Sequence, residues 1–470
     1  MLTSIVRVAI GPPDCESPSH LVINESAQPT PDVSSKKERA GWYMYDWANS
    51  AFATTVVTAF LGPYLTGIAN NGADSDGYIS VMGGLLSFKA GSLWPYVTAL
   101  SVILQVLVLP ITGAIADRTP YKKQLLGVLA YIGAAATTGL VFLTGERYEL
   151  GAWLFLIANV SLGASVVVYN SFLPQIAVEK DRDKVSSRGW AMGYLGGGLL
   201  FLFNLIALLM GGAENQAEIA RWSLVSAGLW WAGFTTFTML WLRNRDPYEG
   251  SPEGSVFTDG FKQFFRTLRG LKAYPLTLLF LVAFLIYNDG IQTVIALAGL
   301  YGAEELGFEL TQLMPVILMV QILAFGGALL LGWMANRYGA KNTVLGSLVA
   351  WVGIVCVAYF VPAGNFPVFL ALGAGIGLVL GGSQALSRSL FSQLIPKGKE
   401  GEYFGLYEIS DKGTSWLGPL LFGLAYDLTG SYRIAIISLI IFFAVGFVLL
   451  LAVPMRRAIV AAGNTPPEKV

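Results

Sequence analysis

The sequence predicts an all-α membrane protein in which twelve transmembrane helices form two halves of six. Three observations support this: an apolar composition, a series of long apolar runs, and an uneven distribution of Lys and Arg. The 470 residues are 54% hydrophobic and 13% charged, and their mean hydropathy is +0.59. A soluble domain is typically about 25% charged, so this chain has too few charged residues to cover a water-facing surface of its size.

The charged residues, cysteines and histidine exclude several classes of protein. Lys and Arg together number 30, as do Asp and Glu, and this balance argues against a nucleic-acid partner. Cys15 lies in a polar segment and Cys356 in an apolar run, so no disulfide framework is expected. His20 is the single histidine, which excludes a histidine-based zinc site or proton relay in the apolar part of the chain. We expect no metal and no cofactor.

Residues 1–40 are predicted to form a disordered cytoplasmic tail. The apolar stretch "LTSIVRVAI" is interrupted by Arg7 and is shorter than the roughly 20 residues that a spanning helix needs. A signal peptide is a weaker interpretation, because no small-residue cleavage site follows. Residues 11–38 are rich in Pro, Ser and acidic residues, a composition typical of disordered segments.

Twelve apolar runs are each long enough to cross a bilayer core of about 30 Å. They lie at about 43–69, 91–116, 123–144, 151–174, 189–211, 222–242, 274–301, 311–335, 342–361, 366–388, 403–426 and 432–455. The longest internal polar stretch, 243–272, divides them into six and six. We therefore expect an N-terminal bundle at 41–243, a cytoplasmic linker at 244–272, a C-terminal bundle at 273–456 and a cytoplasmic tail at 457–470.

The distribution of Lys and Arg predicts the orientation, because cytoplasmic loops carry the excess of these residues. With the N-terminus inside, 25 of the 30 Lys and Arg residues fall in cytoplasmic segments. Lys89, Arg147, Arg221 and Arg433 fall outside, and Lys412 lies within a span. Both termini are therefore predicted to be cytoplasmic, and one span more or fewer would destroy the asymmetry.

The two predicted halves share a loop motif. The second span ends in "GAIADRTPYKK" and the eighth in "GWMANRYGAKN". The matched positions, 219 residues apart, are Gly113 with Gly332, Asp117 with Asn336, Arg118 with Arg337, and Lys122 with Lys341. The fourth and tenth spans also end alike, in "SFLPQIA" and "SLFSQLIP". Parallel six-helix repeats are an architecture of secondary transporters.

Twelve spans with G-x-x-x-D-R-x-x-x-K-K in the second-to-third loop resemble the major facilitator superfamily. The stretches "YDWANSAFATTVVTAFLGPYL", "YNDGIQTVIALAG" and "EYFGLYEISDKGTSWLGPLLFG" resemble its vacuole-effluxer branch, which includes autophagy-related amino-acid effluxers of fungi and bacterial proteins described as unknown major facilitators. The resemblance covers residues 39–455. It implies the major facilitator fold and an efflux-type transporter that works by alternating access. Proton coupling is a separate prediction, motivated by Asp46 and Asp289.

The same resemblance implies a location and a set of partners. The protein would lie in the inner membrane of a bacterium or the vacuolar membrane of a fungus. We expect a monomer in the lipid bilayer that binds a small-molecule substrate and protons but no nucleotide.

Five ionisable residues lie inside predicted spans, where each costs about 2.5–3.5 kcal/mol at mid-membrane. They are Asp46, Asp289, Glu408, Asp411 and Lys412. Asp46 lies about one turn inside the first span, where the helix macrodipole favours a carboxylate; the alternative is a gate contact. Its aromatic neighbours, including Trp42, would suit the edge of a membrane.

Asp289 lies near the middle of the seventh span. It is predicted either to make a structural hydrogen bond between helices or to bind substrate and exchange protons, as buried carboxylates can. In the major facilitator fold the first, fourth, seventh and tenth spans line the cavity. The resemblance therefore implies that five residues of these spans line the cavity and bind substrate: Asn49, Asn159, Asp289, Gln292 and Gln384. Their polarity suits a small zwitterion such as an amino acid, and it also suits a sugar.

Glu408, Asp411 and Lys412 form a predicted cluster at the cytoplasmic end of the eleventh span. Glu408 and Lys412 are four residues apart in the favourable order for a salt bridge; the alternative is a gate that breaks and reforms. Arg388 closes the tenth span and is predicted either to pair with this cluster or to extend to the headgroups.

The loop motif is assigned to conformational control. The resemblance implies that Asp117 meets the start of a neighbouring helix, where an anion is favoured, while Arg118 and Lys122 pair with nearby acids. In the second copy, Gly332 and Arg337 are kept, but Asn336 replaces the acid. We therefore expect a weaker latch there.

Three alternatives stand beside an amino-acid transporter. A membrane enzyme is disfavoured, because the sequence has no G-x-x-x-x-G-K-[ST], H-E-x-x-H or G-x-S-x-G. A carrier of another solute, such as a sugar or drug, and a non-transporting sensor on the same scaffold remain open.

Overall fold

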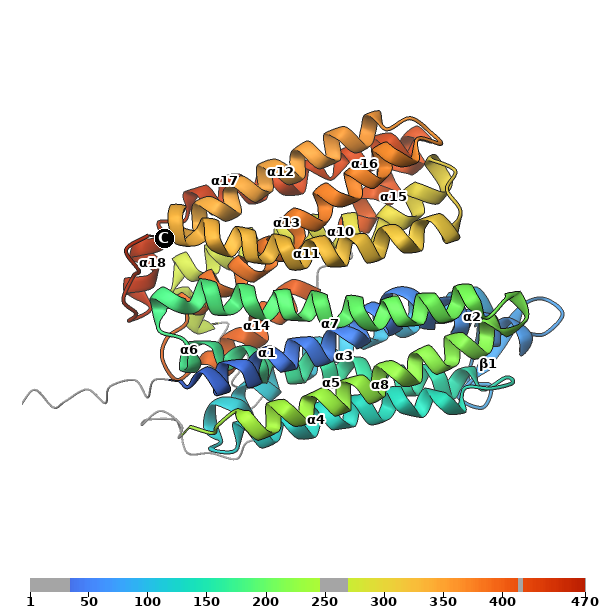
Figure 1. Ribbon diagram of the computed structural model, residues 1–470, viewed down its shortest axis with the longest axis horizontal. Coiled ribbons are helices and arrows are strands. Elements are labelled where there is room, and N and C mark those ends of the chain that lie inside the picture. The colour runs from blue at the N-terminus through green and yellow to red at the C-terminus, as the bar shows by residue number, and fades with distance from the viewer. Residues whose placement is uncertain (1–33, 246–268, 413–416, 470) are drawn as a thin grey trace, which may run out of the picture. The chain divides into compact units, whose positions relative to one another are not determined.

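The computed structural model describes residues 34–245, 269–412 and 417–469, and within these ranges the chain is helical apart from one short hairpin and its connecting loops (Figure 1). Membrane-spanning chains favour helices because each helix satisfies its own backbone hydrogen bonds in lipid. We call residues 34–245 the N-terminal half and residues 269–469 the C-terminal half.

The N-terminal half begins with α1 (Lys36–Ala51), which continues through a π-helical segment (Phe52–Phe60) into α2 (Leu61–Asn71). The following helices are α3 (Leu93–Arg118), α4 (Lys122–Thr138), α5 (Tyr148–Ser171), α6 (Leu173–Ile176), α7 (Arg182–Met210) and α8 (Gln216–Trp241).

The C-terminal half begins with α10 (Pro275–Leu300), which starts on a proline, a residue suited to the first helical turn. The following helices are α11 (Leu310–Tyr338), α12 (Ala340–Phe360), α13 (Phe366–Gln393), α14 (Glu400–Lys412), α15 (Leu417–Thr429), α16 (Tyr432–Ser438), α17 (Ile440–Ala452) and α18 (Met455–Ala461). Gly339, with a φ of 90°, separates α11 from α12, and glycine adopts this backbone conformation at little cost.

Ten helical runs in the described ranges are long and apolar enough to cross a membrane. They correspond to ten of the twelve predicted spans. The sixth, α8, is long enough, but its Trp and Thr residues lower its hydropathy. The eleventh is divided into α14 and α15, and residues 413–416 between them lie outside the description. The full count of twelve and the two-repeat arrangement therefore stay predictions.

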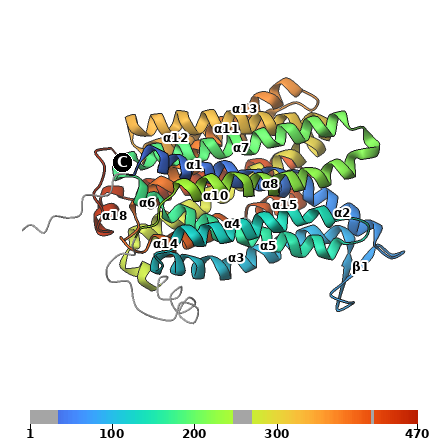
Figure 2. The ribbon, with the colours of Figure 1, turned by 60° about the horizontal axis from the view of Figure 1, so that its bottom comes forward.

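Helix packing joins each half internally and then joins the halves to each other. In the N-terminal half α1 packs on α7 and α8, and α4 packs on α5 and α8; in the C-terminal half α10 packs on α17, and α11 packs on α13. Between the halves α7 packs on α11 and α13, while α14 packs on α3 and α5 (Figures 1 and 2). The fifth predicted span therefore packs on the eighth, and the second packs on the eleventh. Moving each span number by six turns the first pair into the second, so the two contacts occupy equivalent places if the halves are repeats.

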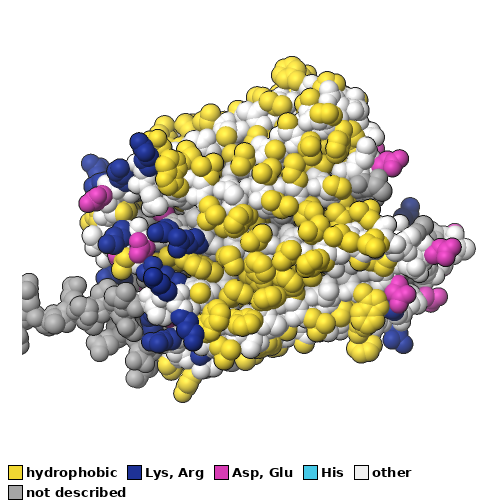
Figure 3. All heavy atoms as spheres, in the orientation of Figure 1, with side chains coloured by type: hydrophobic (Ala, Val, Ile, Leu, Met, Phe, Trp, Pro, Cys, Tyr) yellow, Lys and Arg dark blue, Asp and Glu magenta, His cyan; other side chains and the backbone are white. Residues whose placement is uncertain are grey.

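The surface matches a chain embedded in lipid. Large apolar side chains on many helices are exposed, among them Phe203 at 54% and Val349 at 59%. Figure 3 shows apolar side chains over the middle of one face and Lys and Arg gathered at one end. We call this the basic end. It is where α1 and α7 begin, α11 ends and α18 lies, so it includes Lys36, Arg182, Arg337 and Arg456.

The predicted boundary of the N-terminal tail at residue 40 is wrong, because α1 already begins at Lys36. The Ser35 side chain accepts the backbone N–H of Glu38 at 3.1 Å and caps the helix. Glu38 is buried and receives two hydrogen bonds from Arg245, at 2.7 and 3.1 Å. The sequence signal was the S-x-x-E capping pattern at Ser35. Residues 1–33 and 246–268 of the predicted tail and linker lie outside the description.

Residues 457–469 also differ from a simple tail. They include the end of α18, and the buried Asn464 side chain donates to the carbonyls of Gln393 and Ile395. The C-terminal residues are thus fastened to the end of α13.

A β-hairpin joins the first two spans and was not predicted. Strands β1 (Tyr78–Val81) and β2 (Leu86–Lys89) pair antiparallel. The turn between them passes through positive φ at Met82, Gly83 and Gly84, and a Gly-Gly pair is a recognised hairpin signal.

Candidate functional site

A cavity of about 160 Å³ lies where helices of both halves meet. At roughly 30 Å³ for each water molecule, it has room for about five waters or a small solute. Its lining comes from α1, the π-helical segment, α5, α7, α10, α13 and α14. The polar and aromatic members are Asp46, Asn49, Ser50, Asn170, Trp190, Phe284, Gln384, Arg388, Tyr407, Glu408 and Asp411.

Arg388 of α13 is the cation of this cavity, and it is buried, with 2% of its surface exposed. Its guanidinium donates to the hydroxyl and the carbonyl of Ser186, each at 2.9 Å, and to the Asn170 side chain at 3.2 Å. Nη1 and Nη2 each lie 3.4 Å from Oδ2 of Asp46. Arg388 therefore joins α13 to α1, α5 and α7 of the other half.

Three aromatic rings surround the guanidinium. Its central carbon lies 4.9 Å from the centroid of Trp42, 5.6 Å from Tyr169 and 5.4 Å from Trp190. Trp42 and Tyr169 stack on each other with centroids 4.4 Å apart. Guanidinium groups are attracted to aromatic faces, and the attraction grows when water is excluded. The rings thus replace part of the hydration that Arg388 gives up.

Asp46 is held from two sides. It accepts a hydrogen bond of 2.6 Å from the Tyr169 hydroxyl in addition to its contact with Arg388. Gly189 of α7 makes room for the pair, because a Cβ there would lie 2.7 Å from Oδ2 of Asp46 and 3.0 Å from the Arg388 guanidinium. A buried ion pair is tolerated only when additional hydrogen bonds satisfy it, and this pair has them.

The other acidic residues of the lining are bound to amides. Glu408 accepts from Asn170 at 2.8 Å, so that Asn170 links it to Arg388. Asp411 accepts from Asn288 at 2.8 Å and from Gln292 at 3.5 Å. The lining therefore carries three carboxylates and one guanidinium among its described side chains, a set that can bind an ammonium and a carboxylate at once.

The structure brings together most of the predicted site residues but separates three of them. Asp46, Asn49, Gln384, Arg388, Glu408 and Asp411 all line the cavity. Gln292 is outside the lining and donates to Asp411, which belongs to it. Asn159 is outside the lining and donates instead to Ser101 of α3 at 2.9 Å, so its expected place in the cavity is wrong.

Asp289 is also outside the cavity. Its side chain faces the first turn of α15, where a Cβ at Gly418 would lie 3.1 Å from Oδ2 of Asp289. Neither oxygen completes a hydrogen bond within the part of the chain that the structure describes. The residue is 1% exposed, and the positive end of a helix favours an anion in such a place. The preceding residue, Asn288, is rotated by about 100° around the same helix and faces Asp411.

Arg388 is buried and does not extend to the headgroups. Among the described side chains, Asn170 links it to Glu408 of the predicted cluster. The predicted contact between Glu408 and Lys412 stays a prediction, because the Lys412 side chain lies outside the description.

The first copy of the loop motif fastens α3 to α14. Asp117 accepts the backbone N–H groups of Gly401 at 2.7 Å and Glu402 at 2.9 Å, in the first turn of α14. Lys122 lies 3.9 Å from the same carboxylate. Gly113 allows the close approach, because a Cβ there would collide with the Gly401 carbonyl. Arg118, at the end of α3, also has an interaction partner.

The second copy has a different arrangement. Gly332 approaches the Ser187 side chain of α7, where a Cβ would lie 2.5 Å from the hydroxyl. Asn336 and Arg337 are exposed, and Lys341 donates to the carbonyls of Leu451 and Val453 at 2.9 and 2.7 Å. The two copies thus share the glycine contact but not the capping carboxylate.

Further hydrogen bonds join the halves between the cavity and the basic end. Arg182 donates to the Ser392 carbonyl at 3.0 Å, and Ser389 donates to Asp183 at 2.6 Å. Ser186 donates to the Ala385 carbonyl at 2.7 Å. With the Asp117 contact, these bonds hold the basic end together in this conformation.

Several residues of the cavity were missed by sequence reasoning. Asn170 and Tyr169 end the apolar fourth span as "VVVYNS", and an amide inside such a run was a usable signal. Ser186 and Trp190 gave no usable sequence signal, because Ser and Trp are common at helix ends. Trp42 was expected at the membrane edge, but it is fully buried.

Comparison with known proteins agrees with this architecture. The family model described as "Vacuole effluxer Atg22 like" matches residues 34–463. YxiO of Bacillus subtilis (strain 168), described as an uncharacterized MFS-type transporter, is 31% identical over 423 residues, which cover 89% of this chain and 95% of that protein. Autophagy-related protein 22 of Pyricularia oryzae is 27% identical over 517 residues, which cover 87% of this chain and 74% of that protein.

Solved structures share the fold at low sequence identity. A bacterial homologue of the iron transporter ferroportin, in an outward-facing state, matches with a TM-score of 0.62 and 15% identity, over 88% of this chain and 98% of that one. The fucose:proton symporter FucP of E. coli matches with a TM-score of 0.57 and 14% identity, over 88% and 97%. The chain therefore belongs to the Atg22-like vacuole effluxer family and is a membrane transporter of the major facilitator superfamily.

Proposed function

We propose that this protein is a secondary active transporter that exports a small zwitterion of the amino-acid class, by alternating access of two six-helix halves to the cavity around Arg388. The observation that carries the proposal is the ion pair between the buried Arg388 and the partly buried Asp46, which come from opposite halves and line the cavity. We assign the basic end to the cytoplasm, because Lys and Arg accumulate on that side of membrane proteins.

The charges of the lining favour a zwitterion over a sugar. Arg388 would receive the substrate carboxylate in place of Asp46, since guanidinium groups bind carboxylates through paired donors. Glu408 and Asp411 offer sites for the ammonium. Trp190 adds a donor, because its Nε1 has no acceptor among the described residues. A sugar would be bound through amides and hydroxyls and would make no use of the opposite charges that this lining presents.

Proton coupling follows from the same exchange of partners. When a substrate carboxylate takes Arg388, Asp46 loses its cation inside the cavity. A buried charge without a partner is costly, so protonation of Asp46 would accompany binding. The fold neighbour FucP is a fucose:proton symporter, which supports proton coupling as part of the proposal.

Flux into sealed liposomes tests the proposal. Purified protein would be reconstituted and supplied with each labelled amino acid in turn, with and without a pH gradient, and with xylose and fucose as sugar controls. We expect saturable amino-acid flux that the gradient drives and that requires no nucleotide. Absence of flux for every amino acid, with sugar flux present, would contradict the substrate class.

Two matched variants test whether Asp46, in the cavity, couples transport to the pH gradient. Asp46→Asn should retain exchange of substrate but lose its response to the pH gradient. Asp427→Asn removes an exposed acid of α15 and should behave as wild type. A gradient response that survives in Asp46→Asn would exclude Asp46 as the coupling residue.

A further inference from the structure

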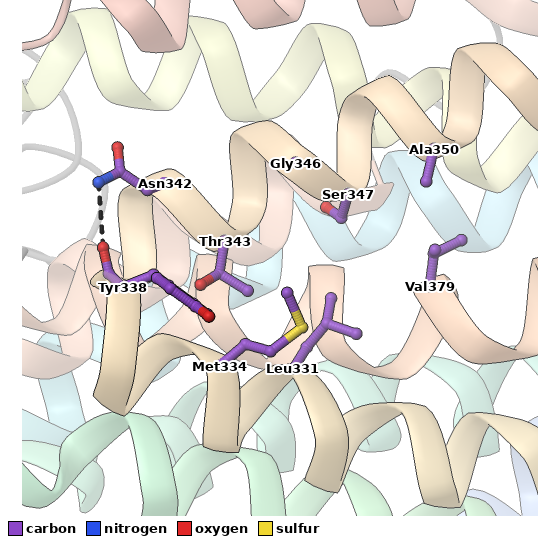
Figure 4. A pocket seen from close by; sticks show the side chains of 9 residues that line it. All are labelled: Leu331, Met334, Tyr338, Asn342, Thr343, Gly346, Ser347, Ala350 and Val379. Atoms are coloured by element: carbon purple, nitrogen blue, oxygen red, sulfur yellow. Dashed lines mark hydrogen bonds between the residues drawn. The ribbon is translucent and has the colours of Figure 1, made fainter.

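A groove on the C-terminal half lies apart from the transport cavity, between α11 and α12. It has a volume of about 520 Å³. Figure 4 shows Leu331, Met334 and Tyr338 of α11 on one side, the opposing residues of α12 on the other, and Val379 of α13 beyond them. These α11 residues recur every three or four positions, so they share one face. The groove remains open because α12 contributes small residues.

Gly346 shows how empty the groove is. A Cβ at this position would meet no heavy atom within 4 Å. From Tyr338 to Leu331 the groove extends seven residues along α11, or about 10 Å at 1.5 Å per residue. One leaflet of a bilayer has about 15 Å of hydrocarbon, half of the 30 Å core. The groove therefore has the length and the lining that suit the upper part of one acyl chain.

A second pocket of about 530 Å³ adjoins the groove at the basic end, and both share Tyr338 and Asn342 in their linings. Its cationic side chains are Lys341, Arg456, Arg457 and Lys469, and no acidic side chain is among its lining residues. Asn336 stands where the first copy of the loop motif has Asp117, which removes a negative charge from this region. Trp333 and Tyr338 are 57% and 55% exposed beside it, as aromatic residues at headgroup level often are.

The cationic side chains of this pocket can still bind an anionic ligand. Lys341 uses two of its three donors on backbone carbonyls. Arg456 donates to the Glu468 carbonyl and Lys469 to the Arg337 carbonyl. Backbone carbonyls do not neutralise the positive charge of these side chains, and no described acidic side chain forms an ion pair with them. Basic pockets between transmembrane helices at the cytoplasmic side are suited to anionic headgroups.

We propose that the groove and the basic pocket together bind one anionic phospholipid of the leaflet at the basic end. An acyl chain lies between α11 and α12, and the phosphate lies among Lys341, Arg456, Arg457 and Lys469. Because α11 also packs on α7 of the other half, the lipid contacts a helix that must move when the halves rock. The site is independent of the substrate and of proton coupling.

Native mass spectrometry of the full-length protein tests the proposal. The protein in detergent would be titrated with dioleoyl phosphatidylglycerol, with dioleoyl phosphatidylcholine as the neutral lipid of identical chains, and with glycerol 3-phosphate as a headgroup without chains. We expect one phosphatidylglycerol to be retained at least about tenfold more strongly than phosphatidylcholine, given the strength of Lys and Arg contacts with anionic lipid. Glycerol 3-phosphate should not compete at equal concentration.

Two variants and a control locate the site. R456Q/R457Q should weaken phosphatidylglycerol retention by about tenfold or more, and G346L should weaken it by filling the groove. K36Q/K37Q removes two exposed cations of α1 at the same end and should match wild type. Undiminished retention in both R456Q/R457Q and G346L would overturn the proposal, as would an equal loss in K36Q/K37Q. Competition by glycerol 3-phosphate would show an anion site without an acyl chain, which also overturns it.

Discussion

Replacing Arg388 by Met would remove the cation that joins the halves at the cavity. The guanidinium donates to Ser186, Asn170 and Asp46 and lies against three aromatic rings. Its loss leaves the Asp46 carboxylate with the Tyr169 hydroxyl and no cation. Removing one partner of a buried ion pair costs about 3–5 kcal/mol, chiefly because the other charge stays buried. We expect the free energy of unfolding of Arg388→Met to fall by that amount.

A double-mutant cycle separates the ion pair from the rest of the site. Asp46→Asn alone leaves Arg388 with Ser186, Asn170 and the rings, so we expect a smaller loss, of about 1.5–3 kcal/mol. The double variant, Arg388→Met with Asp46→Asn, has no buried charge of either sign. We therefore expect it to recover about 1–3 kcal/mol relative to the sum of the single changes.

Denaturant unfolding in detergent, followed by the combined fluorescence of the 12 tryptophans, measures these differences. Arg221→Met provides the control, because Arg221 pairs with Glu218 at 3.7 Å near the surface, where a salt bridge contributes about 0–1 kcal/mol. The reasoning is refuted if Arg388→Met behaves like Arg221→Met, or if the losses in the cycle are additive.

Three further predictions follow from other contacts. Asp117→Asn weakens the charged cap of α14 by about 1 kcal/mol, so a cysteine at Ser389 should react faster with a thiol reagent; an unchanged rate would argue against a latch. Asp289→Asn should keep flux that responds to a pH gradient, since Asp289 faces α15 rather than the cavity; loss of that response in transport assays would contradict this placement. Glu38→Gln removes the charge that binds Arg245 and should cost about 1–3 kcal/mol, measured by thermal unfolding; an unchanged midpoint would show that the pair adds nothing.

The placement of most helices was predictable, because a span needs about 20 apolar residues whatever its neighbours are. The loop motif was also informative: Asp117 and Gly113 are local in sequence, and their partner is the start of one helix. The sixth and eleventh predicted spans are the two that do not match one long apolar helix in the described ranges. Trp and Thr reduce the hydropathy of α8, and the eleventh span is described as two shorter helices.

The partners of the site residues were not predictable, since they depend on which face of each helix points inward. Asn288 and Asp289 are adjacent in sequence, yet one faces Asp411 and the other faces α15. An apolar helix gives no periodic signal that would separate these directions. Arg388 and Asp46 are far apart along the chain, and only the packing of α13 against the N-terminal half brings them together.

The central claim is that the halves exchange access to the cavity and that the basic end is closed in this conformation. A chain without Cys15 and Cys356, with cysteines at Asp183 and Ser389, can be joined across that end by a short dithiol-specific cross-linker. These positions are now in contact at 2.6 Å. Flux in liposomes should stop when the cross-link is complete and return when it is cleaved. Full flux through the cross-linked protein would contradict alternating access at this cavity.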